Sequence, residues 1–228
     1  MGTHLTKKTQ MMLCALILAA PCCKAADIDG EQFIRTLGGT YIELFTTQAC
    51  LAPGYAAIWH DEAAKYVGEQ NADVAIQTLV GGCLGTLVGD DAVAAYAATG
   101  TPRFCCSFTQ GVTRLVFDGD TITGIDPDGS TLFSHRYRFV QTDDEGNYIY
   151  ESKDGNTDEF RYFWMRPDSP AATFHLEFRY GSDAGQLVRL MSGKYAFWMA
   201  SAVREGHPEE HAAAIRLFVG ENLGATQE

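Results

Sequence analysis

The 228 residues include 29 acidic and 17 basic side chains, which gives a formal net charge of −12. So acidic a surface repels nucleic acid and anionic lipid, and nucleic acid is excluded as an expected partner. Hydrophobic residues make up 46% of the chain, which excludes a disordered protein and allows one domain with a sizeable core.

The first 26 residues have the pattern of a secretory signal peptide. Lys7 and Lys8 precede an apolar run at 11–20, which Pro21 and small residues follow. The run has about ten residues, whereas a membrane span needs about twenty. We therefore expect export to the periplasm, the extracellular space or the cell surface. An ordinary buried N-terminal helix is the alternative.

A lipid anchor is a competing form of export. Acylation of Cys22 or Cys23 would attach the protein to a membrane, and no other membrane association is expected. Pro21 argues against it, because small residues usually precede an acylated cysteine. Cleavage after residue 26 would remove three lysines and no acid, so the charge would change from −12 to −15.

Four cysteines follow the expected signal peptide: Cys50, Cys83, Cys105 and Cys106. In an oxidising compartment an even number permits two disulfides, with three possible pairings. A bridge between the adjacent Cys105 and Cys106 would strain the intervening peptide, so each is expected to pair with Cys50 or Cys83. Buried thiols and a cysteine-based zinc site are alternatives, although no Cys-x-x-Cys spacing supports the zinc site.

The rest of the chain, 27–228, is expected to form one domain. Residues 38–46 alternate as in a strand, and a helical segment at about 53–99 follows. Residues 113–181 predict about six short strands separated by turns, an antiparallel meander. The later expected helices are 184–191 and 208–223.

One turn of the meander has alternating oxygen donors. Asp126, Asp128 and Ser130 are spaced as in a calcium loop, but no glutamate stands at the twelfth position and strands flank the segment. A plain turn is the interpretation we adopt. The fold class is α+β, mainly β, and a meander avoids exposed edges by closing into a barrel.

Three segments resemble the ZinT/YodA-like family of exported zinc-binding proteins. They are 39–42 in the first strand, 58–64 in the first helix and 160–164 in a late strand. The resemblance spans roughly 38–201 and implies a lipocalin-like (calycin) barrel with an inserted helical segment and a C-terminal helix. It also implies binding of zinc or a similar divalent cation, and a metal-uptake transporter as a partner.

The resemblance changes at the metal site. The family holds zinc with three histidines, two of them in a His-x-His pair on a late strand. Here His175-Leu176-Glu177 offers one histidine and one glutamate. Alternation in a strand places His175, Glu177 and Arg179 on one face, which is either the solvated outer side of the barrel or the lining of its cavity.

The other histidines supply one further candidate ligand. His135 shares a strand face with Phe133, Tyr137 and Phe139, so it is expected to point inward, as a core residue or as a third ligand beside His175 and Glu177. His60 is expected to be exposed on a helix. His207 and His211 are expected on the surface, with His207 before the helix because Pro208 follows it.

These observations support a metal-binding protein that buffers or delivers zinc. The metal ligands would be His175, Glu177 and His135. A lipocalin-like carrier with an aromatic-lined cavity and a secreted interaction module without a ligand are the alternatives. No complete catalytic motif occurs in the sequence, so no enzymatic activity is expected.

Overall fold

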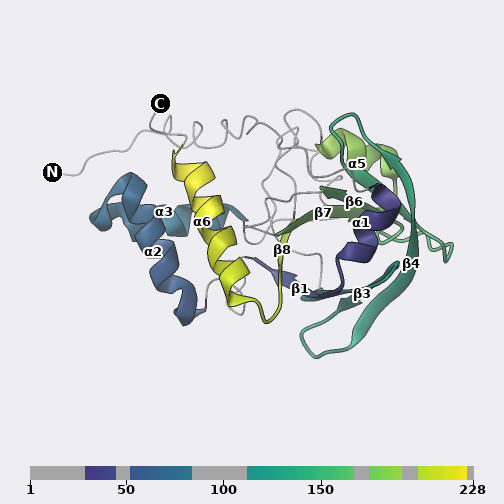
Figure 1. The fold of residues 1–228 in the computed structure, drawn as a ribbon, viewed down its shortest axis with the longest axis horizontal. Helices are drawn as coiled ribbons and strands as arrows, with labels where there is room; N and C mark the ends of the chain where they lie inside the picture. Colours follow the sequence, from purple (N-terminus) through teal and green to yellow (C-terminus); the bar gives the residue numbers. More distant parts are fainter. Residues whose placement is uncertain (1–28, 45–51, 84–111, 167–174, 192–199, 225–228) are drawn as a thin grey trace.

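The computed structural model describes residues 29–44, 52–83, 112–166, 175–191 and 200–224 (Figure 1). The expected signal peptide, the part of the expected helical segment after residue 83, and Cys50, Cys105 and Cys106 lie outside these residues. Of the four cysteines, only the backbone of Cys83 is described, as the last residue of a helix. The predicted disulfides therefore stay a prediction.

Eight antiparallel strands close into a barrel in the order β1 to β8. The strands are β1 (Gly39–Glu43), β2 (Arg114–Asp118), β3 (Thr121–Ile125), β4 (Thr131–Thr142), β5 (Tyr148–Ser152), β6 (Tyr162–Arg166), β7 (Leu176–Gly181) and β8 (Ala200–Arg204). The predicted meander is confirmed as β2 to β7. The sequence analysis missed β8, which closes the barrel by pairing with both β7 and β1.

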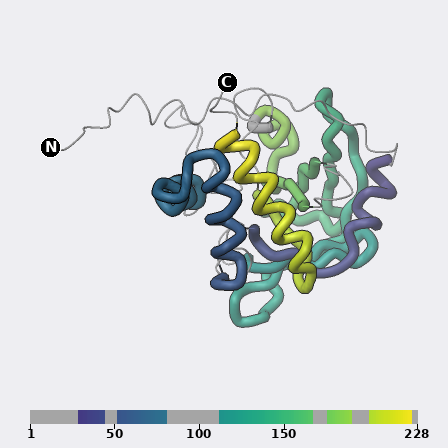
Figure 2. Tube along the Cα trace, turned by 60° about the vertical axis from the view of Figure 1, so that its left-hand side comes forward, coloured from purple at the N-terminus to yellow at the C-terminus, as the bar shows by residue number. Residues whose placement is uncertain are grey.

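Five helices surround the barrel in the described part of the chain. They are α1 (Gly30–Thr36), α2 (Pro53–Val67), α3 (Glu69–Cys83), α5 (Ala184–Met191) and α6 (Pro208–Gly224). Figure 1 shows α2, α3 and α6 together on the side of the barrel away from β4. In the view of Figure 2, α2 and α6 again lie side by side, in agreement with their contacts.

Local sequence explains where the helices begin and end. Asp29 caps α1, since its carboxylate accepts a hydrogen bond from the Gln32 N–H at 2.9 Å. Pro53 stands in the first turn of α2, where a missing N–H costs nothing. The same helix ends at Gly68, whose φ of 79° favours glycine.

The barrel interior is a packed aromatic core. Alternation along the strands directs one set of side chains inward, and α1 adds Phe33, Ile34 and Leu37 to the same cluster. The large aromatic members are Phe33, Tyr41, Phe117, Phe133, Tyr137, Tyr150, Phe163, Phe178 and Tyr180. Their rings contact one another, for example Phe163 with Tyr137 and Tyr180. The aromatic residues of the meander are therefore core material here.

Two buried tyrosines have their hydroxyl groups satisfied within this core. Tyr137 donates to the carbonyl of Phe160 at 2.5 Å, and Tyr150 donates to the carbonyl of Gly30 at 2.7 Å. Burial raises the pKa of both phenols above the ordinary value, with smaller contributions from nearby acidic groups such as Asp158. The bond from Tyr150 also fixes α1 to the barrel.

A second core joins the barrel to the helices. Ile42 of β1 and Val203 of β8 point away from the barrel interior and pack in one cluster with α2, α3 and α6. Trp59 of α2 and Ile215 of α6 are two of its most deeply buried members. The helical layer thus covers the outer face of the two strands that close the barrel.

The Asp126 turn is a plain turn, as predicted. Its carboxylate Oδ1 accepts the backbone N–H groups of Asp128 at 2.9 Å and Ser130 at 2.7 Å. The φ of Gly129 is 85°, which suits glycine. Oδ1 of Asp126, one of the oxygen donors that suggested calcium, thus already accepts hydrogen bonds from the backbone of the turn.

Gly124 leaves room for an aromatic ring across the strand pair. It faces Phe133, and a Cβ at this position would lie 2.2 Å from Cε1 of that ring. We expect Gly124→Ala to displace Phe133 and to lower the free energy of unfolding by roughly 1–2 kcal/mol in urea denaturation. Gly38→Ala is the control, because a Cβ there meets nothing within 4 Å. Equal stability of the two variants would contradict the prediction.

Candidate functional site

His175, Glu177 and Arg166 form a polar row on the outer face of the barrel. Nε2 of His175 lies 3.5 Å from Oε1 of Glu177, and Nη1 of Arg166 lies 3.2 Å from Oε2 of the same carboxylate. Arg166 and Glu177 are cross-strand partners in β6 and β7. The sequence analysis placed His175 within the strand, but the residue directly precedes β7, which begins at Leu176.

Neither expected environment for this face is the observed one. Leu176, Phe178 and Tyr180 fill the barrel interior, so the face with His175 and Glu177 points outward. It is nevertheless covered, because the side chains of His175 and Glu177 are only 9% and 16% exposed. The alternation of side chains along the strand identified the two faces correctly. However, α5 packs against β6 and β7, so the outward face of these strands is not exposed to solvent here.

The charges of this row favour an ionised Glu177. Burial by itself raises the pKa of the Glu177 carboxyl, but hydrogen bonding and charge from His175 and Arg166 outweigh it and hold the pKa below the ordinary value. The arrangement therefore stabilises a carboxylate between two partners. The same separation of His175 and Glu177 would also suit two ligands of one metal ion.

His135 has a partner of its own. It points inward from β4, as predicted, and its ring stacks beside Phe133 with centroids 5.9 Å apart. Nδ1 of His135 lies 3.3 Å from Oδ2 of Asp154. In the described residues, His135 is not in a group whose possible ligand atoms all lie within 4.8 Å of those of His175 and Glu177. The structure therefore brings together two of the three predicted ligands.

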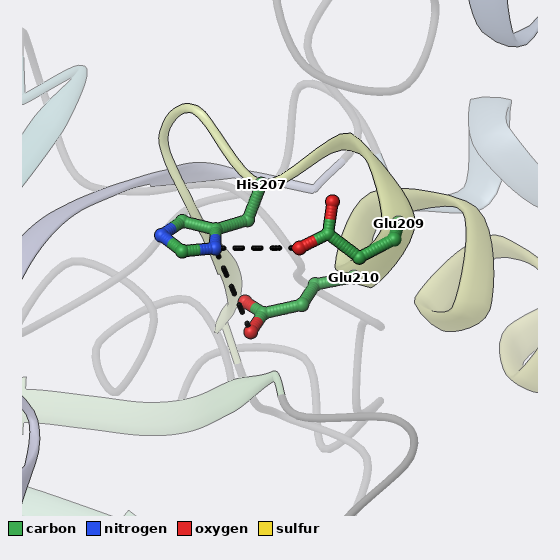
Figure 3. Close-up of side chains that lie close together, drawn as sticks. All are labelled: His207, Glu209 and Glu210. Atoms are coloured by element: carbon green, nitrogen blue, oxygen red, sulfur yellow. Dashed lines mark ion pairs between the residues drawn. The ribbon is translucent and has the colours of Figure 1, made fainter.

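One group of three candidate ligands lies together in the described residues. It consists of His207, Glu209 and Glu210, whose possible ligand atoms all lie within 4.8 Å of one another. Figure 3 shows both carboxylates directed toward the His207 ring. Nδ1 of His207 lies 3.5 Å from Oε1 of Glu209 and 3.9 Å from Oε1 of Glu210. We call these three residues the turn cluster.

The turn between β8 and α6 creates this arrangement. His207 stands before Pro208, the first residue of α6, and its carbonyl accepts the N–H groups of Glu210 and His211. The two carboxylates lie in the first turn of α6, where the helix dipole favours negative charge. The dipole thus gives the glutamates a structural role, and the imidazole of His207 makes the group a possible metal site.

The protonation of Glu209 suits cation binding. The N–H of its own residue, at the start of α6, is the largest cause of a lowered pKa; burial opposes it, and His207 and Arg204 lower the pKa further. Glu209 is the most exposed ligand of the turn cluster, with 72% of its side chain accessible. Solvent therefore reaches an ionised oxygen at this site.

Two other histidines, His60 and His211, belong to neither of these groups. His60 on α2 is partly exposed and lies 3.7 Å from Glu69 and 4.0 Å from Asp73 of α3. The prediction that His211 is a surface residue was wrong, since the residue is 4% exposed. Its Nε2 donates to the carbonyl of Arg204 at 2.7 Å, and its ring lies beside Tyr55. His211 therefore anchors α6 to β8.

The sequence analysis did not select the turn cluster. It identified His207 as a residue before the helix, which is correct, but treated it as paired with His211. The useful signal is the run His207-Pro208-Glu209-Glu210, because a proline at the first helical position marks the start of a helix and so places both glutamates in its first turn, next to His207.

The comparisons with known proteins concern the barrel. The chain is similar to the Zn(II)-bound ZinT-like domain of AdcA from Streptococcus pneumoniae, with a TM-score of 0.48 and 14% identity over 81% of this chain and 89% of that one. It is also similar to Zn(II)-bound AdcA of the same organism, with a TM-score of 0.43 and 12% identity over 79% of this chain and 34% of that one. No protein-family model and no curated protein matches the sequence.

The fold itself is a closed eight-stranded antiparallel barrel. The eight strands, the helices inserted after β1 and the helix at the C-terminal end agree with the architecture that the sequence resemblance implied. Identity this low places no ligand of the zinc-bound structures on a residue of this chain. In the described residues, no helix is both long and apolar enough to span a membrane.

Proposed function

We propose that this protein binds a divalent cation, with a preference for zinc, through His207, Glu209 and Glu210. One observation carries the proposal: an imidazole nitrogen and two carboxylate oxygens already lie within 4.8 Å of one another. Tetrahedral zinc with bonds of about 2.0–2.2 Å holds its ligand atoms about 3.3–3.6 Å apart. The separations of 3.5 and 3.9 Å from His207 need little adjustment.

The donor set favours zinc over magnesium or calcium. Imidazole suits zinc and other transition metals, whereas magnesium and calcium prefer oxygen ligands alone. Three protein ligands leave a fourth position for water or for a ligand of a partner. Because two of its three ligands, His207 and Glu209, are open to solvent, the turn cluster suits reversible loading better than permanent structural binding.

Buffering or delivery of zinc outside the cell is the role that we propose for such a site. The signal-like segment 1–26 supports export, and the charge of −12 attracts cations. A metal-uptake transporter is the proposed partner, and no enzymatic activity is proposed.

Calorimetric titration of the metal-stripped protein with zinc tests the proposal. We expect a dissociation constant below about 10 μM. His207→Ala should weaken binding by about tenfold or more, because it removes the only nitrogen ligand of the turn cluster. His60→Ala is the control, since His60 also lies among carboxylates but belongs to no such group of three.

A third variant compares the two candidate sites. His175→Ala should leave zinc affinity unchanged, because His175 and Glu177 are mostly buried and Glu177 is already paired with Arg166. Absence of binding tighter than about 10 μM would rule out the proposal. Loss of binding in His175→Ala, with His207→Ala unchanged, would instead assign the site to β7.

A further inference from the structure

Arg204 holds one of the proposed ligands in a forked ion pair. Its Nε donates to Oε2 of Glu210 at 2.8 Å, and its Nη2 donates to Oε1 of the same carboxylate. Arg204 is the last residue of β8, and Glu210 lies in the first turn of α6. A two-point pair of this kind fixes the orientation of both groups.

The barrel fixes the position of Arg204. Its Cα pairs with Tyr41 in β1, and its carbonyl accepts a hydrogen bond from the buried ring of His211. Glu205, the next residue, donates its N–H to the carbonyl of Thr40 at 2.8 Å. These contacts fix the backbone of Arg204, and so they place the start of its side chain beside the turn cluster whether or not a cation is bound.

We infer that Arg204 competes with the cation for the Glu210 carboxylate and thereby sets a low affinity at the turn cluster. The inference rests on the proposed function of that cluster. With His207 neutral, the two glutamates supply two negative charges and Arg204 cancels one of them. A positive charge in contact with a ligand repels a divalent cation directly.

The same pair lowers the cost of releasing the metal. A partly buried carboxylate left without a partner would be costly, and the side chain of Glu210 is only 15% exposed. In the metal-free protein Arg204 satisfies both of its oxygens. The ion therefore leaves behind a stable site, which is the property that delivery to a partner requires.

Replacement of Arg204 isolates its charge. Arg204→Gln keeps a donor for Glu210 and removes the positive charge, so zinc should bind about tenfold more tightly in calorimetry. Arg204→Lys keeps the charge and should stay within about threefold of the unchanged protein. Arg114→Gln is the matched control, because Arg114 forms a similar pair with Glu205 and touches no proposed ligand. It should change the affinity by less than about twofold.

The outcomes separate this inference from the proposed function. If the unchanged protein shows no zinc binding that depends on His207, the proposed function fails. If such binding exists and Arg204→Gln leaves it equal or weaker, the inference is overturned and the function stands. Equal tightening in Arg204→Gln and Arg114→Gln would also overturn it, since net charge alone would then explain the effect. Circular dichroism of each variant confirms that it is folded.

Discussion

Phe163→Ala is expected to lower the free energy of unfolding by about 3–5 kcal/mol. Phe163 is fully buried in the barrel interior, and its ring centroid lies 5.2 Å from that of Tyr137 and 5.3 Å from that of Tyr180. Alanine would leave a cavity at the centre of the aromatic core, where rings from several strands cannot collapse together. Urea denaturation followed by tryptophan fluorescence measures the loss.

Leu132→Ala provides the comparison for this prediction. Leu132 lies on the outer face of β4 and is 46% exposed, so its truncation should cost less than about 1 kcal/mol. A loss below about 1.5 kcal/mol for Phe163→Ala would show that the barrel interior is not packed to the density of a protein core. That result would revive the hypothesis of a carrier with a hollow, aromatic-lined barrel.

Glu177→Gln should be the next most damaging change, at about 2–3 kcal/mol near neutral pH. The substitution keeps the shape of the side chain and removes its charge, so Arg166 and His175 lose a common partner in a covered position. Glu205→Gln is the control, because the pair of Glu205 with Arg114 is more exposed and should contribute at most about 1 kcal/mol.

The effect of Glu177→Gln should depend on pH. The pKa of Glu177 in the folded protein lies below its ordinary value of 4.5. Its contribution is therefore fully present above about pH 4.5 and is lost as the pH falls through the lower folded value. We expect the stabilities of the two proteins to converge in acid and to differ most at neutral pH. A constant difference from neutral pH down to pH 3 would contradict this assignment.

The strands were predictable where their side chains alternate and turns separate them. β2 to β7 satisfy both conditions. β8 escaped notice because Ala200-Ser201-Ala202-Val203-Arg204 contains small residues, which have little strand propensity of their own. Pairing with β1 and β7, far away in the sequence, makes this segment a strand.

The short helix α1 was missed for a related reason. No helix was predicted before the first strand, since a helix of only seven residues is marginal by itself in water. Its formation depends on burying Phe33 and Ile34 in the barrel interior, and on the hydrogen bond from Tyr150. None of these contacts is local in sequence.

The sequence predicted the residue types of the candidate metal site, histidine and glutamate, better than it predicted their position in the fold. The sequence showed that His175 and Glu177 share a face, which the structure confirms, but it could not show that Arg166 would pair with the carboxylate. The turn cluster comes from four consecutive positions and is local. It was overlooked because the sequence analysis considered His207 as a pair with His211. The glutamates Glu209 and Glu210 are the residues that lie beside His207.

Closure of the barrel by β8 makes folding depend on a strand that is synthesised long after β1. Tyr41 pairs with Arg204, more than 160 positions later, so the second edge of β1 is covered only after the other seven strands have been synthesised. A chain that is cut before Ala200 would expose two open edges, on β1 and on β7, and each could recruit a strand from another molecule. Truncated chains should therefore accumulate as aggregates, even though most of the aromatic core is already encoded.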